Sequence, residues 1–156
     1  MKLLKENYLF ILLIIFLFII DRFSKTKILS ILENQDFIFI NDYLNLNLIF
    51  NTGIVCGLLS LNAGIFYNLL SILISIIIIV LFYFMIKSKL YDKIFFSLII
   101  GGAIGNIYDR VVFKAVPDFI DFHIKSFHWF SFNIADIFIS LGIIFMLLKE
   151  IKFRNK

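Results

Sequence analysis

The fold is decided by residues 64–86, GIFYNLLSILISIIIIVLFYFMI, a stretch without a single charged side chain. A helix rises about 1.5 Å per residue, so this stretch measures about 34 Å and can cross a hydrocarbon core of roughly 30 Å. Three other apolar stretches are also long enough to span, at residues 8–28, 94–112 and 132–148. The sequence therefore predicts a membrane all-α bundle with four transmembrane helices.

The composition of the chain supports a lipid environment. Of its 156 residues, 62% are hydrophobic and 17% are charged, whereas an ordinary soluble domain is about 45–50% apolar. A water-soluble protein of this size has too little interior to bury so much apolar surface. We expect one integral membrane domain, residues 1–156, without an internal disulfide, because Cys56 is the single cysteine.

Two segments connect the predicted spans on one side of the membrane, residues 29–63 and 113–131. In the first, polar and apolar residues partly alternate over 37–40 and 44–50, which predicts a small external β-containing segment between helices 1 and 2. The second is rich in phenylalanine. Because aromatic rings prefer the boundary between membrane and water, we expect it to lie along the outer interface.

The net charge of +4 does not indicate a nucleic-acid partner, because the basic residues gather at the two termini and in the connection at residues 87–93. Four spans put these three segments on one face. That face holds nine basic and three acidic residues, and the opposite face holds six basic and eight acidic residues. The positive-inside rule therefore predicts a multi-pass protein with both termini in the cytoplasm.

Polar residues on three of the predicted helices lie at one depth. Counted from the cytoplasmic ends of the helices, four of them lie roughly 20–24 Å outward: Asp21, Asn106, Asp109 and Asp136. A charged group in the hydrocarbon costs about 2.5–3.5 kcal/mol at the bilayer centre and less toward the edge. We therefore expect these groups to face each other.

The same residues share helix faces with other polar groups. Spacings of three or four residues join Asp21 with Lys25, Asn106 with Asp109 and Arg110, and Asn133 with Asp136. Any one pair can be structural, an ion pair or hydrogen bond that holds a bundle together. A ring of several carboxylates with Lys25 and Arg110 favours a functional site, because a bundle can pack without charge.

Several kinds of hydrolytic site are disfavoured by their missing motifs. His123 and His128 form no His-Glu-x-x-His helix, no serine lies in a nucleophile elbow, and Cys56 has no candidate base nearby in sequence. Two carboxyl groups that share one proton can activate a water and protonate an amide leaving group, since like charges at close range cannot both ionise. The abundance of outer aspartates therefore fits an aspartyl hydrolase.

Two other classes of protein stay open. Buried carboxylates also mark ion pathways, so the alternative is a polytopic transporter or proton-conducting bundle. A pathway needs polar residues at successive depths, whereas the inner two thirds of the predicted helices hold few, namely Ser71, Ser75 and Ser97. A purely structural assembly partner would tolerate asparagine in place of its buried aspartates.

Four blocks of residues, in order, resemble the motifs of the bacterial lipoprotein signal peptidases, also called signal peptidase II, over about residues 21–142. The blocks are Asp21, Arg22, Phe23, Ser24 and Lys25; Asn51, Thr52, Gly53 and Gly57; Gly101, Gly102, Gly105, Asn106, Asp109 and Arg110, followed by Val116, Asp118 and Phe119; and Phe132, Asn133, Ala135 and Asp136. Cys56 stands where the family usually has an aromatic residue.

This resemblance implies a membrane aspartyl endopeptidase that removes the signal peptide of a prolipoprotein by cleaving before its diacylglyceryl-modified cysteine. The catalytic dyad would be Asp118 and Asp136. The residues that support the site or bind substrate would be Asp21, Lys25, Asn51, Gly53, Asn106, Asp109, Arg110, Asn133 and Ala135. No metal or organic cofactor is implied, and the partners are prolipoproteins and membrane lipid.

The resemblance also implies a location in the bacterial cytoplasmic (inner) membrane, with the active site towards the outer, periplasmic side. A substrate held in the bilayer by its signal helix and acyl chains would arrive by lateral diffusion. We expect residues 37–59 and 119–132 to cover the dyad from outside and to leave a lateral opening.

Overall fold

The computed structural model describes residues 2–35, 37–53 and 63–154, so Cys56 and Gly57 lie outside the described residues. In the described part, helices and strands follow one another in this order: α1 (Lys2–Leu32), β1 (Phe37–Asn41), β2 (Leu44–Asn51), α2 (Ala63–Lys87), α3 (Leu90–Phe113), β3 (Val116–Ile124), β4 (Phe127–Phe132) and α4 (Ile134–Arg154).

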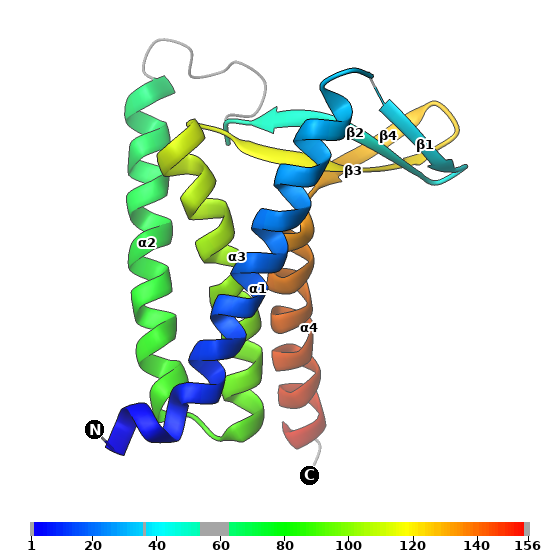
Figure 1. The fold of residues 1–156 in the computed structure, drawn as a ribbon. Coiled ribbons are helices and arrows are strands. Elements are labelled where there is room, and N and C mark those ends of the chain that lie inside the picture. Colours follow the sequence, from blue (N-terminus) through cyan, green and yellow to red (C-terminus); the bar gives the residue numbers. More distant parts are fainter. Residues whose placement is uncertain (1, 36, 54–62, 155–156) are drawn as a thin grey trace.

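The helices form a bundle with the sheet at one end (Figure 1). Helix α3 is central, because it packs against α1, α2 and α4. A buried cluster of Ile14, Met85 and Ile100 joins α1, α2 and α3. The first and last described residues lie at the end of the bundle opposite the sheet.

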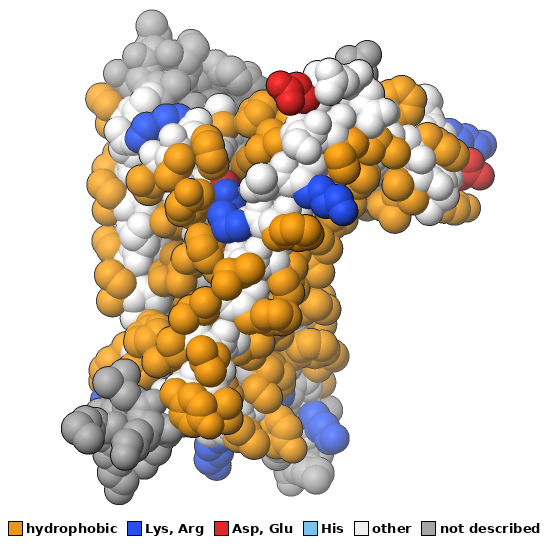
Figure 2. Space-filling model, in the orientation of Figure 1, with side chains coloured by type: hydrophobic (Ala, Val, Ile, Leu, Met, Phe, Trp, Pro, Cys, Tyr) orange, Lys and Arg blue, Asp and Glu red, His pale blue; other side chains and the backbone are white. Residues whose placement is uncertain are grey.

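Two helices, Tyr67–Lys87 and Leu90–Phe113, are long and apolar enough to cross a membrane by length and composition. Helices α1 and α4 have 31 and 21 residues, about 46 and 31 Å at the helical rise. Large apolar side chains such as Leu12, Phe16 and Ile79 are exposed. Figure 2 shows apolar side chains over the length of the bundle on one face. Such a surface suits contact with lipid.

The strands form one antiparallel sheet in the order β1-β2-β3-β4. The strands β1 and β2 confirm the predicted β-containing segment between helices 1 and 2. No strands were predicted in residues 113–131, and the structure shows that this segment supplies the other half of the sheet as a hairpin. Its aromatic and β-branched residues are typical of strands as well as of membrane interfaces. The pairing of β3 with β2 makes this segment part of the sheet.

Glycines let α3 approach its neighbours closely. A Cβ on Gly102 would overlap the carbonyl oxygen of Ala135 and lie 3.2 Å from its carbonyl carbon on α4, and a Cβ on Gly101 would lie 2.8 Å from Leu17 Cβ on α1. Helices in membranes approach one another closely through such small residues. The tight α3–α4 contact brings the first turn of α4 next to the outer half of α3.

We expect Gly102→Ala to lower the free energy of unfolding by about 1–3 kcal/mol, because the new methyl group meets backbone atoms that cannot rotate away. Gly64→Ala is the matched control, since a Cβ there has nothing within 4 Å. It should leave stability unchanged or raise it by up to about 1 kcal/mol. Thermal unfolding of both variants in the same detergent measures the difference. Equal stability would mean that the α3–α4 contact is looser than described.

Candidate active site

Lys25 lies at the centre of a buried polar cluster between α1 and α3, and its side chain is 1% exposed. Its Nζ donates hydrogen bonds to Asp21 Oδ2 at 2.9 Å, Asn106 Oδ1 at 2.9 Å and Asp109 Oδ2 at 2.7 Å. The three donors of the ammonium group are therefore all used. The polar residues expected at one depth do face each other.

Arg22 completes this cluster, although the sequence analysis gave it no role of its own. Its guanidinium contacts Asp109 at 2.5 and 2.8 Å and Asp21 at 3.1 Å, and lies 4.9 Å from the centre of the Tyr108 ring. Two cations thus balance two buried carboxylates. The only signal for Arg22 in the sequence is its place beside Asp21, and adjacent helix positions do not face the same way.

Asp136 is held in the first turn of α4 by a reciprocal cap with Asn133. The backbone N–H of Asn133 donates to Asp136 Oδ2 at 3.1 Å, and the backbone N–H of Asp136 donates to Asn133 Oδ1 at 3.1 Å. Asn106 Nδ2 donates to the other carboxylate oxygen of Asp136 at 2.8 Å. Between them, the N–H of Ala135 donates to Asp21 Oδ1 at 3.1 Å, which ties α4 to α1. This arrangement satisfies N–H groups that a helix start otherwise leaves free.

Asp118 reaches the site from the sheet, because β3 runs from the end of α3 toward β4. Asn133 Nδ2 donates to Asp118 Oδ1 at 2.6 Å, and Asn51 Nδ2 donates to Asp118 Oδ2 at 2.9 Å. The register of β2 and β3 pairs Asn51 with Val116 and Ile49 with Asp118, so Asn51 is a diagonal neighbour of Asp118. Asp118 is 4% exposed.

Gly53 fixes the direction of the Asn51 side chain. Its backbone N–H donates to Asn51 Oδ1 at 2.7 Å, which leaves Asn51 Nδ2 directed at Asp118. Gly53 has a φ of 72°, in the left-handed region that side chains rarely adopt. A glycine at this position therefore allows the turn that aims the Asn51 amide.

Asn133 contacts both Asp118 and Asp136, so it holds the carboxyl groups of β3 and α4 beside each other. Burial raises the pKa of the Asp118 carboxyl above its ordinary value, and the negative charge of Asp136 raises this pKa too. Hydrogen bonds from Asn51 and Asn133 and the charge of Lys25 lower it. Two carboxyl groups at close range can share one proton, because like charges so close cannot both ionise.

Among the described residues, no ion pair joins Arg110 to the carboxylates of the cluster, which pair with Arg22 and Lys25. Arg110 donates a hydrogen bond to the backbone oxygen of Asn106, at 3.5 Å. Its guanidinium instead lies beside Gly53 and at the polar end of a groove of about 570 Å³ between α2, α3 and α4. Apart from Asn106 and Arg110, the lining of this groove is apolar. The groove therefore offers an apolar surface that ends at the site.

We expect Asn51→Ala to move the pH profile of activity to higher pH. The Asn51 amide stabilises the ionised form of Asp118, so its removal raises the pKa of that carboxyl. The charges of Asp136 and Lys25 near Asp118 stay in place. Cleavage measured across pH checks this shift, with Asn47→Ala as the control, since Asn47 lines a pocket near His128 at another part of the sheet. A profile that stays in place would contradict the assigned hydrogen bond.

The chain is similar along its whole length to proteins of known activity. Residues 13–152 match the family described as signal peptidase (SPase) II. A lipoprotein signal peptidase of Pelagibacter ubique (strain HTCC1062) is 48% identical over 155 residues, covering 98% of this chain and 93% of that protein. A lipoprotein signal peptidase of Francisella tularensis subsp. novicida (strain U112) is 36% identical over 160 residues, covering 100% and 99%.

The fold is also similar to that of a solved protein. A bacterial membrane enzyme whose structure was determined by the in meso method superposes with a TM-score of 0.74 and 33% sequence identity, covering 92% of each chain. The family match, from residue 13 to residue 152, runs through the sheet and the polar cluster. The chain belongs to the signal peptidase II family.

Proposed function

We propose that this signal peptidase is an aspartic endopeptidase in which Asp118 and Asp136 are the catalytic residues. One observation carries the proposal: Asn133 binds both carboxyl groups through separate hydrogen bonds, so that β3 and α4 present them side by side. Asp118 is buried, whereas Asp136 is partly exposed. The pair is therefore sheltered and still open to a substrate and a water molecule.

The reaction divides naturally between the two carboxyl groups. The ionised carboxylate takes a proton from a water molecule as this water attacks the scissile carbonyl carbon, and the protonated carboxyl stabilises the developing oxyanion. The carboxyl group that took the proton from the water then gives it to the leaving amide nitrogen as the peptide bond breaks. The raised pKa of the Asp118 carboxyl favours its protonated form and so supports a proton held at this pair.

The names of the relatives and the groove beside the site support a proposal for the substrate class. The relatives are named lipoprotein signal peptidases, and we propose that this chain cleaves prolipoproteins before a diacylglyceryl-modified cysteine. The groove between α2, α3 and α4 supports this proposal, because its apolar walls suit a signal helix or acyl chain and its polar end lies at Asn106 and Arg110.

We also propose that all four helices span the inner membrane, in one integral domain with both termini in the cytoplasm and the sheet on the periplasmic side. Helices α1 and α4 are long enough, and the charges of Asp21 and Lys25 on α1 are paired within the bundle. The turn between α2 and α3 at Ser88 and the hairpin turn at Ser126 would then face opposite sides of the membrane.

Labelling of single cysteines should reveal this topology. In a Cys56→Ser background, a membrane-impermeant maleimide added to spheroplasts should modify Ser126→Cys and leave Ser88→Cys unmodified until the membrane is opened. Ser126 is exposed and Ser88 is partly exposed, so labelling of Ser88→Cys after the membrane is opened is the control for its access. Labelling of Ser88→Cys from outside would reverse the proposed orientation.

The activity is tested with the purified full chain in lipid vesicles and a prolipoprotein precursor. The diacylglyceryl-modified precursor should be cut at the bond before the modified cysteine. The same precursor without the lipid should be cut much more slowly, because it lacks the acyl chains that hold it at the depth of the site. Equal cleavage of both would contradict the proposed substrate class.

The alternative, a transporter or proton-conducting bundle, has less support in the contacts of the inner half. The hydroxyl groups of Ser71, Ser75 and Ser97 donate to backbone carbonyls of their own helices, at 2.7–2.9 Å. Serine hydroxyls bound in this way do not line a water path. The vesicles used for cleavage also report proton flux, which a peptidase should not produce.

A further inference from the structure

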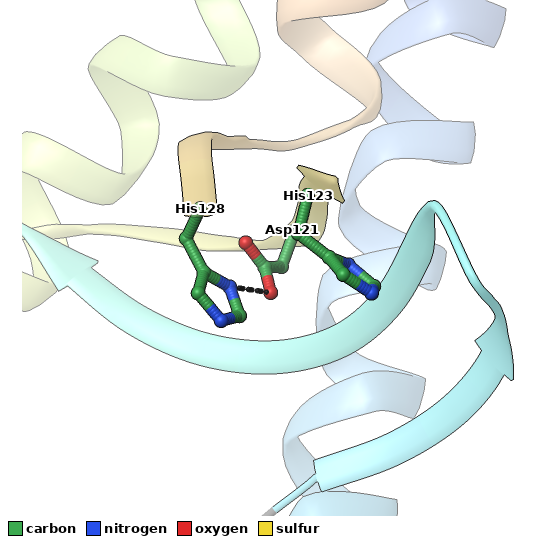
Figure 3. Close-up of side chains that lie close together, drawn as sticks. All are labelled: Asp121, His123 and His128. Atoms are coloured by element: carbon green, nitrogen blue, oxygen red, sulfur yellow. Dashed lines mark hydrogen bonds and ion pairs between the residues drawn. The ribbon is translucent and has the colours of Figure 1, made fainter. Parts of the chain in front are cut away.

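The sheet carries a second cluster of ionisable side chains, formed by Asp121, His123 and His128 (Figure 3). Each residue offers one ligand atom, a ring nitrogen or a carboxylate oxygen, and these atoms lie within 4.8 Å of one another. His123 and His128 are the only histidines of the chain. The peptidase reaction as proposed uses none of the three.

The pairing of β3 and β4 explains why these residues meet. Asp121 and His123 are two positions apart on β3 and so point to the same face of the sheet. His123 is the register partner of His128 on β4, after an irregularity that follows Phe122. The two imidazole rings are stacked, with centroids 5.3 Å apart and planes at 25°.

Two buried atoms at this cluster have no hydrogen-bond partner among the described residues. One is Nδ1 of His123, a residue that is 6% exposed. The other is Oδ1 of Asn45, which is the register partner of Asp121 on β2. A buried polar atom without a partner costs free energy, because it has lost its hydrogen bonds to water. A bound metal ion would remove this cost, because it accepts a lone pair from such an atom.

The cluster can be reached from outside. Asp121 and His128 line a pocket of about 360 Å³ together with residues of β2 and β4. The His128 side chain is 56% exposed, and its Nδ1 lies 2.7 Å from Asp121 Oδ2. Asp121 and His123 are thus held in place by burial, whereas the exposed His128 ring can rotate.

We propose that Asp121, His123 and His128 bind one divalent first-row transition metal ion, for which Zn²⁺ is the probe. Two imidazoles and one carboxylate are a borderline donor set that suits Zn²⁺, Ni²⁺ and Cu²⁺ better than Mg²⁺ or Ca²⁺. Ligand atoms around tetrahedral Zn²⁺ lie about 3.3 Å apart. His128 Nδ1 and Asp121 Oδ2 are 2.7 Å apart, and the exposed His128 ring would have to move for the three ligand atoms to reach this spacing.

The ion would act as a cross-link between β3 and β4. Strand β3 carries Asp118, and β4 leads through Phe132 to Asn133. A cross-link in this hairpin would hold the two ends of the site together without touching substrate. The expected effects are therefore on metal content and stability.

Metal binding is tested by titrating Zn²⁺ into the purified full chain in detergent, after treatment with a chelator. One ion should bind per chain in the micromolar range or tighter, and it should raise the Tm. His128→Ala should weaken binding at least about tenfold and remove the rise in Tm, because a ligand is lost at an exposed position that folding does not need. Ser126→Ala, a neighbouring exposed change, should bind as the unchanged chain does.

A second measurement identifies the ligands. Cu²⁺ bound to the chain should show electron paramagnetic resonance couplings to two imidazole nitrogens, and Asp121→Asn should weaken its binding. The proposal is overturned if the unchanged chain shows no saturable binding. It is also overturned if His128→Ala binds Zn²⁺ as tightly as the unchanged chain. The same holds if Zn²⁺ binding is lost in Cys56→Ser but kept in His128→Ala.

Discussion

Asp118→Asn and Asp136→Asn should each reduce cleavage of a diacylglyceryl-modified precursor by about 10³-fold or more. Asparagine keeps the shape of the side chain but cannot share a proton with the remaining carboxyl group. The amide also reverses part of the hydrogen bonding, because Asn51 and Asn133 both donate to Asp118. Single-turnover cleavage in lipid vesicles measures the loss.

The two variants should differ in stability but not in their loss of activity. Asp136 caps the first turn of α4 and accepts hydrogen bonds from Asn106 and from the backbone of Asn133, so its replacement should also lower the Tm. Replacing buried Asp118 removes a charge from an apolar setting and should cost less. Asp42→Asn, in the exposed turn between β1 and β2, is the matched control and should keep full activity. Turnover retained in both variants would remove the proposed dyad.

The helical half of the site could be predicted from the sequence because its geometry is local. Spacings of three and four residues set which side chains share a face, and depth along an apolar helix sets which faces meet. Those two rules bring Asp21, Lys25, Asn106 and Asp109 together, as the structure has them. They say nothing about which neighbour the Arg110 side chain selects, and among the described residues it donates to the backbone of Asn106.

The sheet half of the site depends on pairings between distant strands. Residues of β2 and β3 are more than sixty positions apart, as in the contact between Asn51 and Asp118. No local period specifies that partner, and the aromatic residues of β4 are equally typical of a membrane interface. The resemblance to a family could suggest Asp118, but periodicity could not bring it to the end of α4. The cluster of Asp121, His123 and His128 depends on the register of the β3–β4 hairpin, which has an irregularity after Phe122 that no period in the sequence specifies.

We expect Lys25→Met to lower the free energy of unfolding by about 3–5 kcal/mol, the largest effect on stability of any single change considered. Lys25 and Arg22 together balance the buried carboxylates of Asp21 and Asp109. Methionine keeps the length of the side chain and removes its charge, so one carboxylate is left without a counter-charge in a site of low polarity. Unfolding in mixed detergent micelles measures the loss.

Lys27→Met is the matched control, because Lys27 lies two residues along the same helix and is exposed. Its replacement should change stability little.

A second change separates charge balance from packing. In the Lys25→Met background, Asp21→Asn removes one carboxylate and restores the balance with Arg22, so part of the lost stability should return. The double variant could instead be no more stable than Lys25→Met alone. In that case the ammonium group contributes through its three hydrogen bonds and not through its charge, because methionine cannot donate those bonds.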